Sequence, residues 1–173
     1  AKMLCIEDSQ EFFLYLKTVL KEHILTHVTN LNDAFKIIQN GRDSFDLILL
    51  DVSLPDGNGI KSIGALKDSF NTKSIPIIII SSDGDVLSKV AAFGIGADDY
   101  ILKPPNTEEL KARIAARLRN HQAEQKTSGQ IEIGNLSINS DRMMVQINMN
   151  NNTTHEVELT PSEFKLLKKL SLR

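Results

Sequence analysis

The chain has 173 residues, of which 41% are hydrophobic, and this is enough for a core larger than that of one small domain. Its formal net charge of −2 excludes a basic field over the whole chain, so any affinity for nucleic acid must be local. A single cysteine excludes an internal disulfide, and no apolar run reaches the length of a membrane span. We therefore expect a cytoplasmic protein with one domain and part of another.

The first two thirds of the chain alternate short apolar runs with amphipathic segments, which is typical of a parallel sheet built from βαβ units. The apolar runs predict strands that end, in chain order, near Ile6, Val28, Asp51, Ile80 and Leu102. Helices are expected between them. The first is capped by Ser9 and lined by Phe12, Phe13 and Leu16, another covers Val86 to Phe93, and the last runs from Asn106 to about Asn120.

Residues 121–129 are polar and lose the helical periodicity, and we interpret them as a linker. Beyond them, short stretches near 131–133, 136–138, 144–147 and 157–159 alternate apolar with polar residues and predict a small antiparallel sheet. Residues 160–163 then combine a capping box with a proline at the first helical position, so a helix containing Phe164, Leu167 and Leu170 is expected. The chain ends within this pattern, and we interpret residues 130–173 as an incomplete second domain.

Polar side chains follow four of the predicted strands, at the point where each strand ends. Glu7 and Asp8 follow the first strand, Asp51 ends the third, Ser81 follows the fourth, and Lys103 follows the fifth. The carboxyl ends of parallel strands meet at one edge of a sheet, where open α/β sheets bind their ligands. We therefore expect these side chains to lie together.

Clustered carboxylates repel one another unless a cation neutralises them, and an all-oxygen set of ligands favours Mg²⁺. Lys103 can place a positive charge beside a phosphoryl group, and the Ser81 hydroxyl can donate to one of its oxygens. Together these groups predict phosphoryl transfer to Asp51 as an aspartyl phosphate. Each residue alone has a simpler explanation as a turn, cap or surface residue. Their joint placement at successive strand ends favours the site.

The motifs in residues 2–120 resemble the receiver domains of bacterial two-component response regulators. The segments that carry the resemblance, in order, are Ile6–Ser9, Leu49–Gly59, Pro76–Ser81 and Gly96–Pro104. The resemblance implies a CheY-like, doubly wound α/β fold over residues 1–120, with a five-stranded parallel sheet in the order 2-1-3-4-5. It implies Asp51 as the phosphoacceptor, and Mg²⁺ bound by Asp8, Asp51 and the Ser53 backbone carbonyl, with Glu7 helping through water.

The same resemblance implies a partner histidine kinase that presents a phosphohistidine to Asp51. Ser81 would then be drawn toward the phosphoryl group, and Tyr100 would rotate into the space it leaves; a plain half-buried strand aromatic is the alternative for Tyr100. Such proteins dimerise through the fourth helix, fifth strand and fifth helix. The matching positions are Lys89, Phe93, Asp98, Asp99, Glu109, Ala112 and Arg113. An ordinary solvated helical face is the alternative for these charges.

Residues 135–138 and 159–167 resemble the amino-terminal sheet and first helix of the OmpR/PhoB-type winged-helix domain. The helix and wing that read DNA in that family are not expected in these 173 residues. Three hypotheses follow: a phosphorylation-switched transcription regulator, a receiver that acts only as a protein-interaction module, and an aspartate-nucleophile phosphatase. The third requires a second acid at position 53, where Ser53 stands, so we expect no enzyme beyond a phosphoacceptor that catalyses its own phosphorylation and dephosphorylation.

The sequence departs from the receiver pattern at a few positions. Ser81 stands where threonine is commoner, which preserves the hydroxyl, and Pro105 stands where an aromatic residue often follows Lys-Pro. Asn120 replaces a frequent basic residue. The last two departures affect the start of the last receiver helix and the outer ion pairs of the dimer.

Overall fold

The computed structural model describes most of the chain, with short gaps that are concentrated toward its C-terminal end. The described residues are 1–40, 43–68, 72–128, 130–133, 135–139, 144–148, 154–158, 163 and 167. The chain divides into two compact units, Ala1–His121 and Gln122–Arg173. No helix among the described residues combines the length and apolarity needed to cross a membrane.

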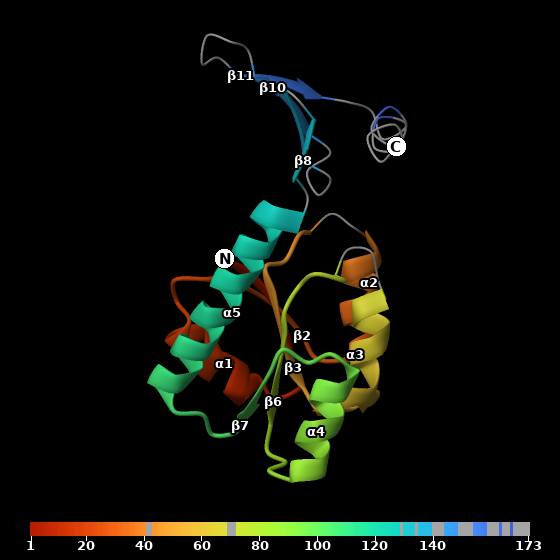
Figure 1. The fold of residues 1–173 in the computed structure, drawn as a ribbon. Coiled ribbons are helices and arrows are strands. Elements are labelled where there is room, and N and C mark those ends of the chain that lie inside the picture. The colour runs from red at the N-terminus through yellow and green to blue at the C-terminus, as the bar shows by residue number, and fades with distance from the viewer. Residues whose placement is uncertain are drawn as a thin grey trace. The chain divides into compact units, whose positions relative to one another are not determined.

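A five-stranded sheet forms the centre of the first unit (Figure 1). Its strands are β1 (Lys2–Ile6), β2 (Ile24–Val28), β3 (Leu47–Asp51), β6 (Ile77–Ser81) and β7 (Asp99–Leu102). All four neighbouring pairs are parallel, and the order is β2-β1-β3-β6-β7. The short strands β4 (Ser53–Leu54) and β5 (Gly57–Asn58) form a separate hairpin. Because β6 and β7 are the fourth and fifth strands of this sheet in chain order, the observed order is the predicted 2-1-3-4-5. The predicted fold class is confirmed.

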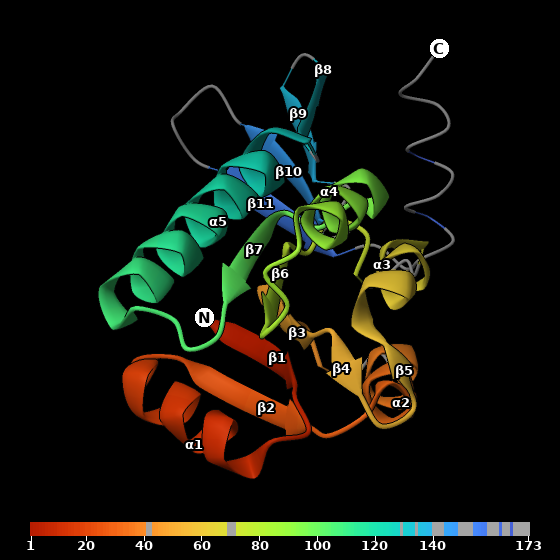
Figure 2. The ribbon, with the colours of Figure 1, turned by 90° about the horizontal axis from the view of Figure 1, so that it is seen from below.

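Helices cover both faces of this sheet (Figures 1 and 2). On one face lie α1 (Gln10–Val19) and α5 (Thr107–Ser128); on the other lie α2 (Leu31–Asn40), α3 (Gly59–Asp68) and α4 (Val86–Ile95). Side chains alternate between the faces with period 2, so Leu4 and Ile6 belong to the core under α2, α3 and α4, while Met3 and Cys5 belong to the core under α1 and α5. The central strands β3 and β6 are consequently buried at every position.

The only cysteine of the chain, Cys5, is a buried free thiol on β1. Burial is the main cause that raises its pKa to about 12, and the nearby Glu7 carboxylate adds to the effect. The thiol therefore stays protonated and acts as a small apolar side chain of the core.

Most helix ends follow the sequence, and two differ from it. The Ser9 Oγ accepts from the Phe12 amide, as predicted for an N-cap. Helix α4 is capped at its start by Asp85 and ends at Ile95, two residues past Phe93, with Gly96 in the left-handed region as its C-cap. Helix α5 does not end near Asn120 but continues to Ser128, through the segment predicted to be a linker. The reason is that residues 121–128 include Ala, Gln, Glu and Lys, which favour helix without an apolar stripe.

The second unit contains the predicted antiparallel sheet. Its strands are β8 (Gln130–Ile133), β9 (Leu136–Asn139), β10 (Met144–Asn148) and β11 (Thr154–Glu158), in the order β11-β10-β9-β8. Ile138 and Val145 are buried in its small core, and Leu167 packs against them. Glu163 and Leu167 are helical. The remainder of the predicted helix, including residues 160–162, 164 and 170, lies outside the described residues.

Candidate functional site

Three acidic side chains meet at the carboxyl edge of the parallel sheet. The register pairs Ile6 of β1 with Leu50 of β3, so the residues that follow them, Glu7 and Asp51, emerge side by side. One carboxylate oxygen from each of Glu7, Asp8 and Asp51 lies within 4.8 Å of the others. Glu7 and Asp51 are 2% and 6% exposed, whereas Asp8 is exposed. The cluster is thus buried on one side and open to solvent on the other.

Lys103 joins two of these acids. Its Nζ lies 2.7 Å from Glu7 Oε2 and 2.8 Å from Asp51 Oδ2, with most of its side chain out of solvent. Because Lys103 directly follows β7 and β7 pairs with β6, the ammonium reaches the acids across the width of β6. The geometry brings together residues that are 96 and 52 positions apart in the chain.

Burial and charge act in opposite directions on these groups. Burial raises the pKa of Glu7 above its ordinary 4.5, and the Asp51 carboxylate adds to this, although hydrogen bonds from Lys103 and Ser9 oppose it. Burial disfavours the Lys103 ammonium, but its hydrogen bonds to Asp51 and Glu7 outweigh burial and raise the pKa of Lys103 above its ordinary 10.5. Lys103 is therefore charged at neutral pH, while the charge on Glu7 is costly.

Two further predicted site residues, Ser53 and Ser81, lie at the start of β4 and at the end of β6. The Ser53 amide donates to Asp51 Oδ1 at 3.3 Å, whereas Lys103 Nζ donates to the other carboxylate oxygen, Asp51 Oδ2. Ser81 is buried, and its Oγ accepts from the Asp83 amide at 3.0 Å. The Ser81 hydroxyl proton is not used by that contact and can be donated elsewhere.

The Tyr100 side chain is turned inward in this structure. It is 7% exposed, and its hydroxyl donates to the Asp83 backbone carbonyl at 2.8 Å. The movement of Tyr100 into the space left by Ser81 stays a prediction, and in this structure both side chains contact Asp83. Asp83 lies two residues after the strand-end Ser81, a spacing that is typical of a side-chain-stabilised turn.

Two further residues shape the loop that carries the site. A Cβ on Gly59 would lie 2.0 Å from the Asp51 carbonyl oxygen, so only glycine lets α3 begin this close to the end of β3. The Asp56 carboxylate accepts from the amides of Leu31 and Asn32, both at 2.9 Å, and so caps α2 from the loop. Hydrogen bonds from these amides lower the pKa of Asp56. In the sequence, the turn motif Asp56-Gly57-Asn58-Gly59 was the signal from which the roles of Asp56 and Gly59 could have been predicted.

The predicted dimer residues fall into two groups. Phe93 and Ala112 are exposed, and Lys89 Nζ lies 5.7 Å from the centre of the Tyr100 ring. The charged residues have partners within the chain: the buried Asp99 pairs with Arg113 and Arg117, and Arg113 also pairs with Glu109. Asp98 accepts from Lys67 Nζ at 3.0 Å and from the Ile77 amide at 2.8 Å, so it ties α3 to the start of β6.

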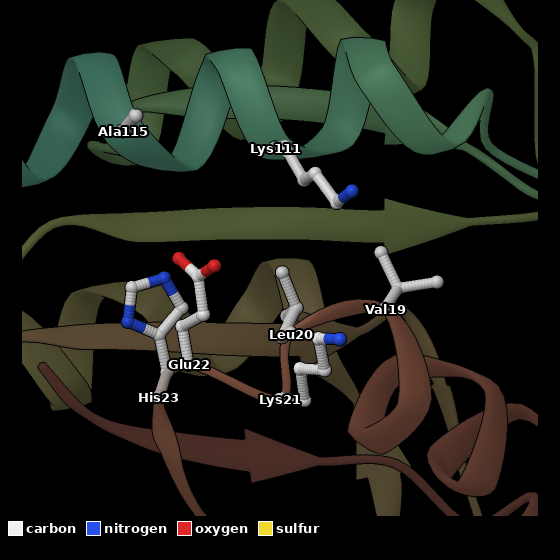
Figure 3. Close-up of a pocket in the computed structure, with 7 residues that line it drawn as sticks. All are labelled: Val19, Leu20, Lys21, Glu22, His23, Lys111 and Ala115. Carbon is white, nitrogen blue, oxygen red and sulfur yellow. The ribbon is translucent and has the colours of Figure 1, made fainter.

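A pocket of about 280 Å³ lies elsewhere in the first unit, between the end of α1 and α5 (Figure 3). Its lining residues are Val19, Leu20, Lys21, Glu22, His23, Lys111 and Ala115. None of these is a predicted site residue. The candidate site is therefore the acidic edge of the sheet and not this pocket.

Comparison with known proteins identifies the class to which this fold and site belong. Residues 3–115 match the family model of the response regulator receiver domain, and the chain belongs to this family. It is 31% identical to the transcriptional regulatory protein BasR of Escherichia coli, over 99% of this chain and 73% of that protein. It is 36% identical to the response regulator ArlR of Staphylococcus aureus, over 96% of this chain and 70% of that protein.

Solved structures agree with this assignment. A two-component response regulator from Clostridium difficile is 30% identical, with a TM-score of 0.61 over 69% of this chain and 96% of that chain. The BeF3-activated receiver domain of Klebsiella pneumoniae RstA is 26% identical, with a TM-score of 0.62 over 69% of this chain and 99% of that chain. The chain is thus a two-component response regulator with relatives that are transcriptional regulators.

Proposed function

We propose that this response regulator is phosphorylated on Asp51 by a partner histidine kinase in the cytoplasm, with Mg²⁺ as the cofactor. The observation that supports the proposal best is the contact of one ammonium with two buried carboxylates: Lys103 Nζ lies 2.7 Å from Glu7 and 2.8 Å from Asp51. A phosphoryl group on Asp51 would lie beside that ammonium, which matches the requirement of phosphoryl transfer for a fixed positive charge.

The acidic cluster fits a divalent cation. Three carboxylates converge within 4.8 Å, and Lys103 contacts two of them. One ammonium does not neutralise three carboxylates, so a hard cation that prefers oxygen ligands suits the negative charge that remains. Asp8 and Asp51, with the Ser53 backbone carbonyl, would hold Mg²⁺, and Glu7 would assist through water. When bound, the ion would neutralise charge on the phosphoryl oxygens.

The proposed reaction is an in-line displacement at phosphorus. A carboxylate oxygen of Asp51 attacks the phosphorus of the kinase phosphohistidine and forms an O–P bond. The P–N bond breaks, and its electron pair remains on the imidazole nitrogen, which takes up a proton. Lys103 stays charged throughout and contacts the developing negative charge, while the Ser53 amide keeps the Asp51 side chain oriented.

The response to phosphorylation would pass through Asp83. The Ser81 hydroxyl can donate to a phosphoryl oxygen while its Oγ continues to accept from the Asp83 amide. The Asp83 carbonyl holds the Tyr100 hydroxyl, so a loop fixed by the phosphoryl group would favour the inward Tyr100. Phosphorylation would then increase the population of the arrangement in which the Tyr100 hydroxyl contacts the Asp83 carbonyl.

The proposed output is transcription control by a phosphorylation-dependent homodimer. Exposed apolar side chains lie on α4 and at the end of β7; they are Val86, Leu87, Val90, Phe93, Ile95 and Leu102. Such a surface favours association of two copies through α4, β7 and α5. DNA would be bound by a winged-helix domain whose amino-terminal sheet would be β8–β11, a proposal supported by the name of BasR as a transcriptional regulatory protein.

Phosphorylation by a small donor tests the proposal. The chain is incubated with phosphoramidate and Mg²⁺, and the modified residue is located by mass spectrometry. One phosphoryl group on Asp51, with no modification of Asp51→Asn or of the wild type without Mg²⁺, would support it. A folded wild type that takes up no phosphate, or takes it up at another residue, would overturn it.

A further inference from the structure

An aromatic ring of α1 lies against the ammonium at the candidate site. The Phe12 ring centre is 4.5 Å from Lys103 Nζ, within the range in which a cation is attracted to the face of an aromatic ring. From the sequence, Phe12 was predicted only to line the apolar face of its helix. The ring does pack partly buried against the core under α1 and α5, and the same ring also covers the charged end of Lys103.

The backbone of this helix turn is fixed to the same acid that Lys103 contacts. Glu7 Oε1 accepts from the Ser9 amide at 3.1 Å, and Ser9 Oγ accepts from the Phe12 amide at 3.2 Å. The other oxygen, Glu7 Oε2, accepts from Lys103 Nζ. These contacts form a closed ring through Glu7, Ser9, Phe12 and Lys103. The position of each residue in this ring therefore depends on the others.

A second aromatic residue extends this contact to the loop after Lys103. Tyr15 stacks on Phe12 with ring centres 5.6 Å apart. Its hydroxyl donates to the Pro105 carbonyl at 3.2 Å and lies 3.1 Å from Thr107 Oγ1, which can donate to it. Helix α1 thus holds both the end of the Lys103 side chain and the backbone that follows it.

We propose that Phe12 is a positioning residue for Lys103: its ring, held by Ser9 and Tyr15, keeps the ammonium directed at the carboxylate of Asp51. A lysine side chain has a flexible four-carbon stem, and a ring face that covers one side of the ammonium reduces the number of positions it can take. The inference rests on the proposed function, because its consequence is the rate at which Asp51 takes up a phosphoryl group.

The test compares rates of phosphorylation by phosphoramidate at saturating Mg²⁺, followed by intact-mass spectrometry of the full chain. Phe12→Leu keeps an apolar side chain but removes the ring face, and we expect it to react about threefold to tenfold more slowly, the range that loss of a partly desolvated cation–π contact allows. Phe12→Trp restores a ring face and should react within about twofold of the wild type. Thermal unfolding of both variants separates this effect from loss of folding.

Phe35→Leu is the matched control, because Phe35 packs against the other core, under α2, α3 and α4, and it should leave the rate unchanged. The inference is overturned if Phe12→Leu reacts at the wild-type rate, or if Phe12→Trp is slowed as much as Phe12→Leu while both remain folded. A folded wild type that takes up no phosphate overturns the proposed function instead, and this inference with it.

Discussion

Gly59 lies so close to Asp51 that a Cβ on the glycine would be 2.0 Å from the Asp51 carbonyl oxygen. The Gly59 amide also donates to the Val52 carbonyl at 2.8 Å. Helix α3 therefore begins directly against the end of the strand that carries the candidate phosphoacceptor. The position of Asp51 depends on a residue that has no side chain.

Substituting Gly59 by alanine should destabilise the chain and disturb the site. The obstructing atom belongs to the backbone, so the end of β3 must shift, and we expect a loss of about 1–3 kcal/mol in the free energy of unfolding. Chemical denaturation measures it. The control is Gly94→Ala, because a Cβ there meets nothing within 4 Å and alanine favours the α4 helix. Equal stability of Gly59→Ala and Gly94→Ala would contradict the prediction.

The raised pKa of Glu7 predicts that its contribution to stability falls as pH rises. The folded chain binds the Glu7 proton more tightly than the unfolded chain does. Glu7 therefore contributes fully to the free energy of unfolding below its ordinary pKa of 4.5. This contribution is lost as the pH rises from 4.5 through the higher pKa of the folded chain. Glu7→Gln should remove this decline. Urea unfolding of both proteins at a series of pH values, without divalent cations, measures it. A wild type and variant with parallel pH profiles would exclude Glu7 as the cause.

Binding of Mg²⁺ to the acidic cluster should stabilise the folded chain. At a free concentration of ten times Kd, mass action adds about 1.4 kcal/mol to the free energy of unfolding. Asp8→Asn removes one of the three clustered carboxylates and should abolish most of this gain. Asp68→Asn removes an exposed acid at the end of α3 and should leave it intact. Thermal unfolding with and without MgCl2 measures the gain, and an equal gain in both variants would place the ion elsewhere.

A charge on the exposed face of α4 should prevent dimerisation without preventing phosphorylation. Leu87 is 76% exposed, and Leu87→Glu would place a carboxylate in the proposed apolar contact between two copies. We expect the phosphorylated variant to dimerise at least about tenfold more weakly in sedimentation. The control is Leu14→Glu, which changes a 52% exposed leucine on α1. If both variants dimerise like the wild type, the dimer uses another surface.

Much of the fold followed from local patterns in the sequence. The apolar runs located all five strands of the parallel sheet, and Ser9 and Asn106 were placed correctly at helix starts, where Asn106 Oδ1 accepts from the Glu108 and Glu109 amides. The extension of α5 to Ser128 was missed, because the prediction relied on apolar periodicity and those residues favour helix by intrinsic propensity. Asp98 and Asp99 were assigned to a dimer surface, and their partners within the chain were not visible from sequence.

The amino-acid sequence by itself determined which residues end the strands, because a run of apolar side chains followed by a polar one is a local pattern and parallel strands bring such ends to one edge. Only the tertiary structure decided how those residues are paired. Lys103 contacts Glu7 as well as Asp51, the Tyr100 hydroxyl contacts the Asp83 carbonyl, and the Phe12 ring covers the Lys103 ammonium. All of these contacts join segments that are distant in the sequence. They depend on the packing of helices and loops against the sheet, which no local pattern encodes.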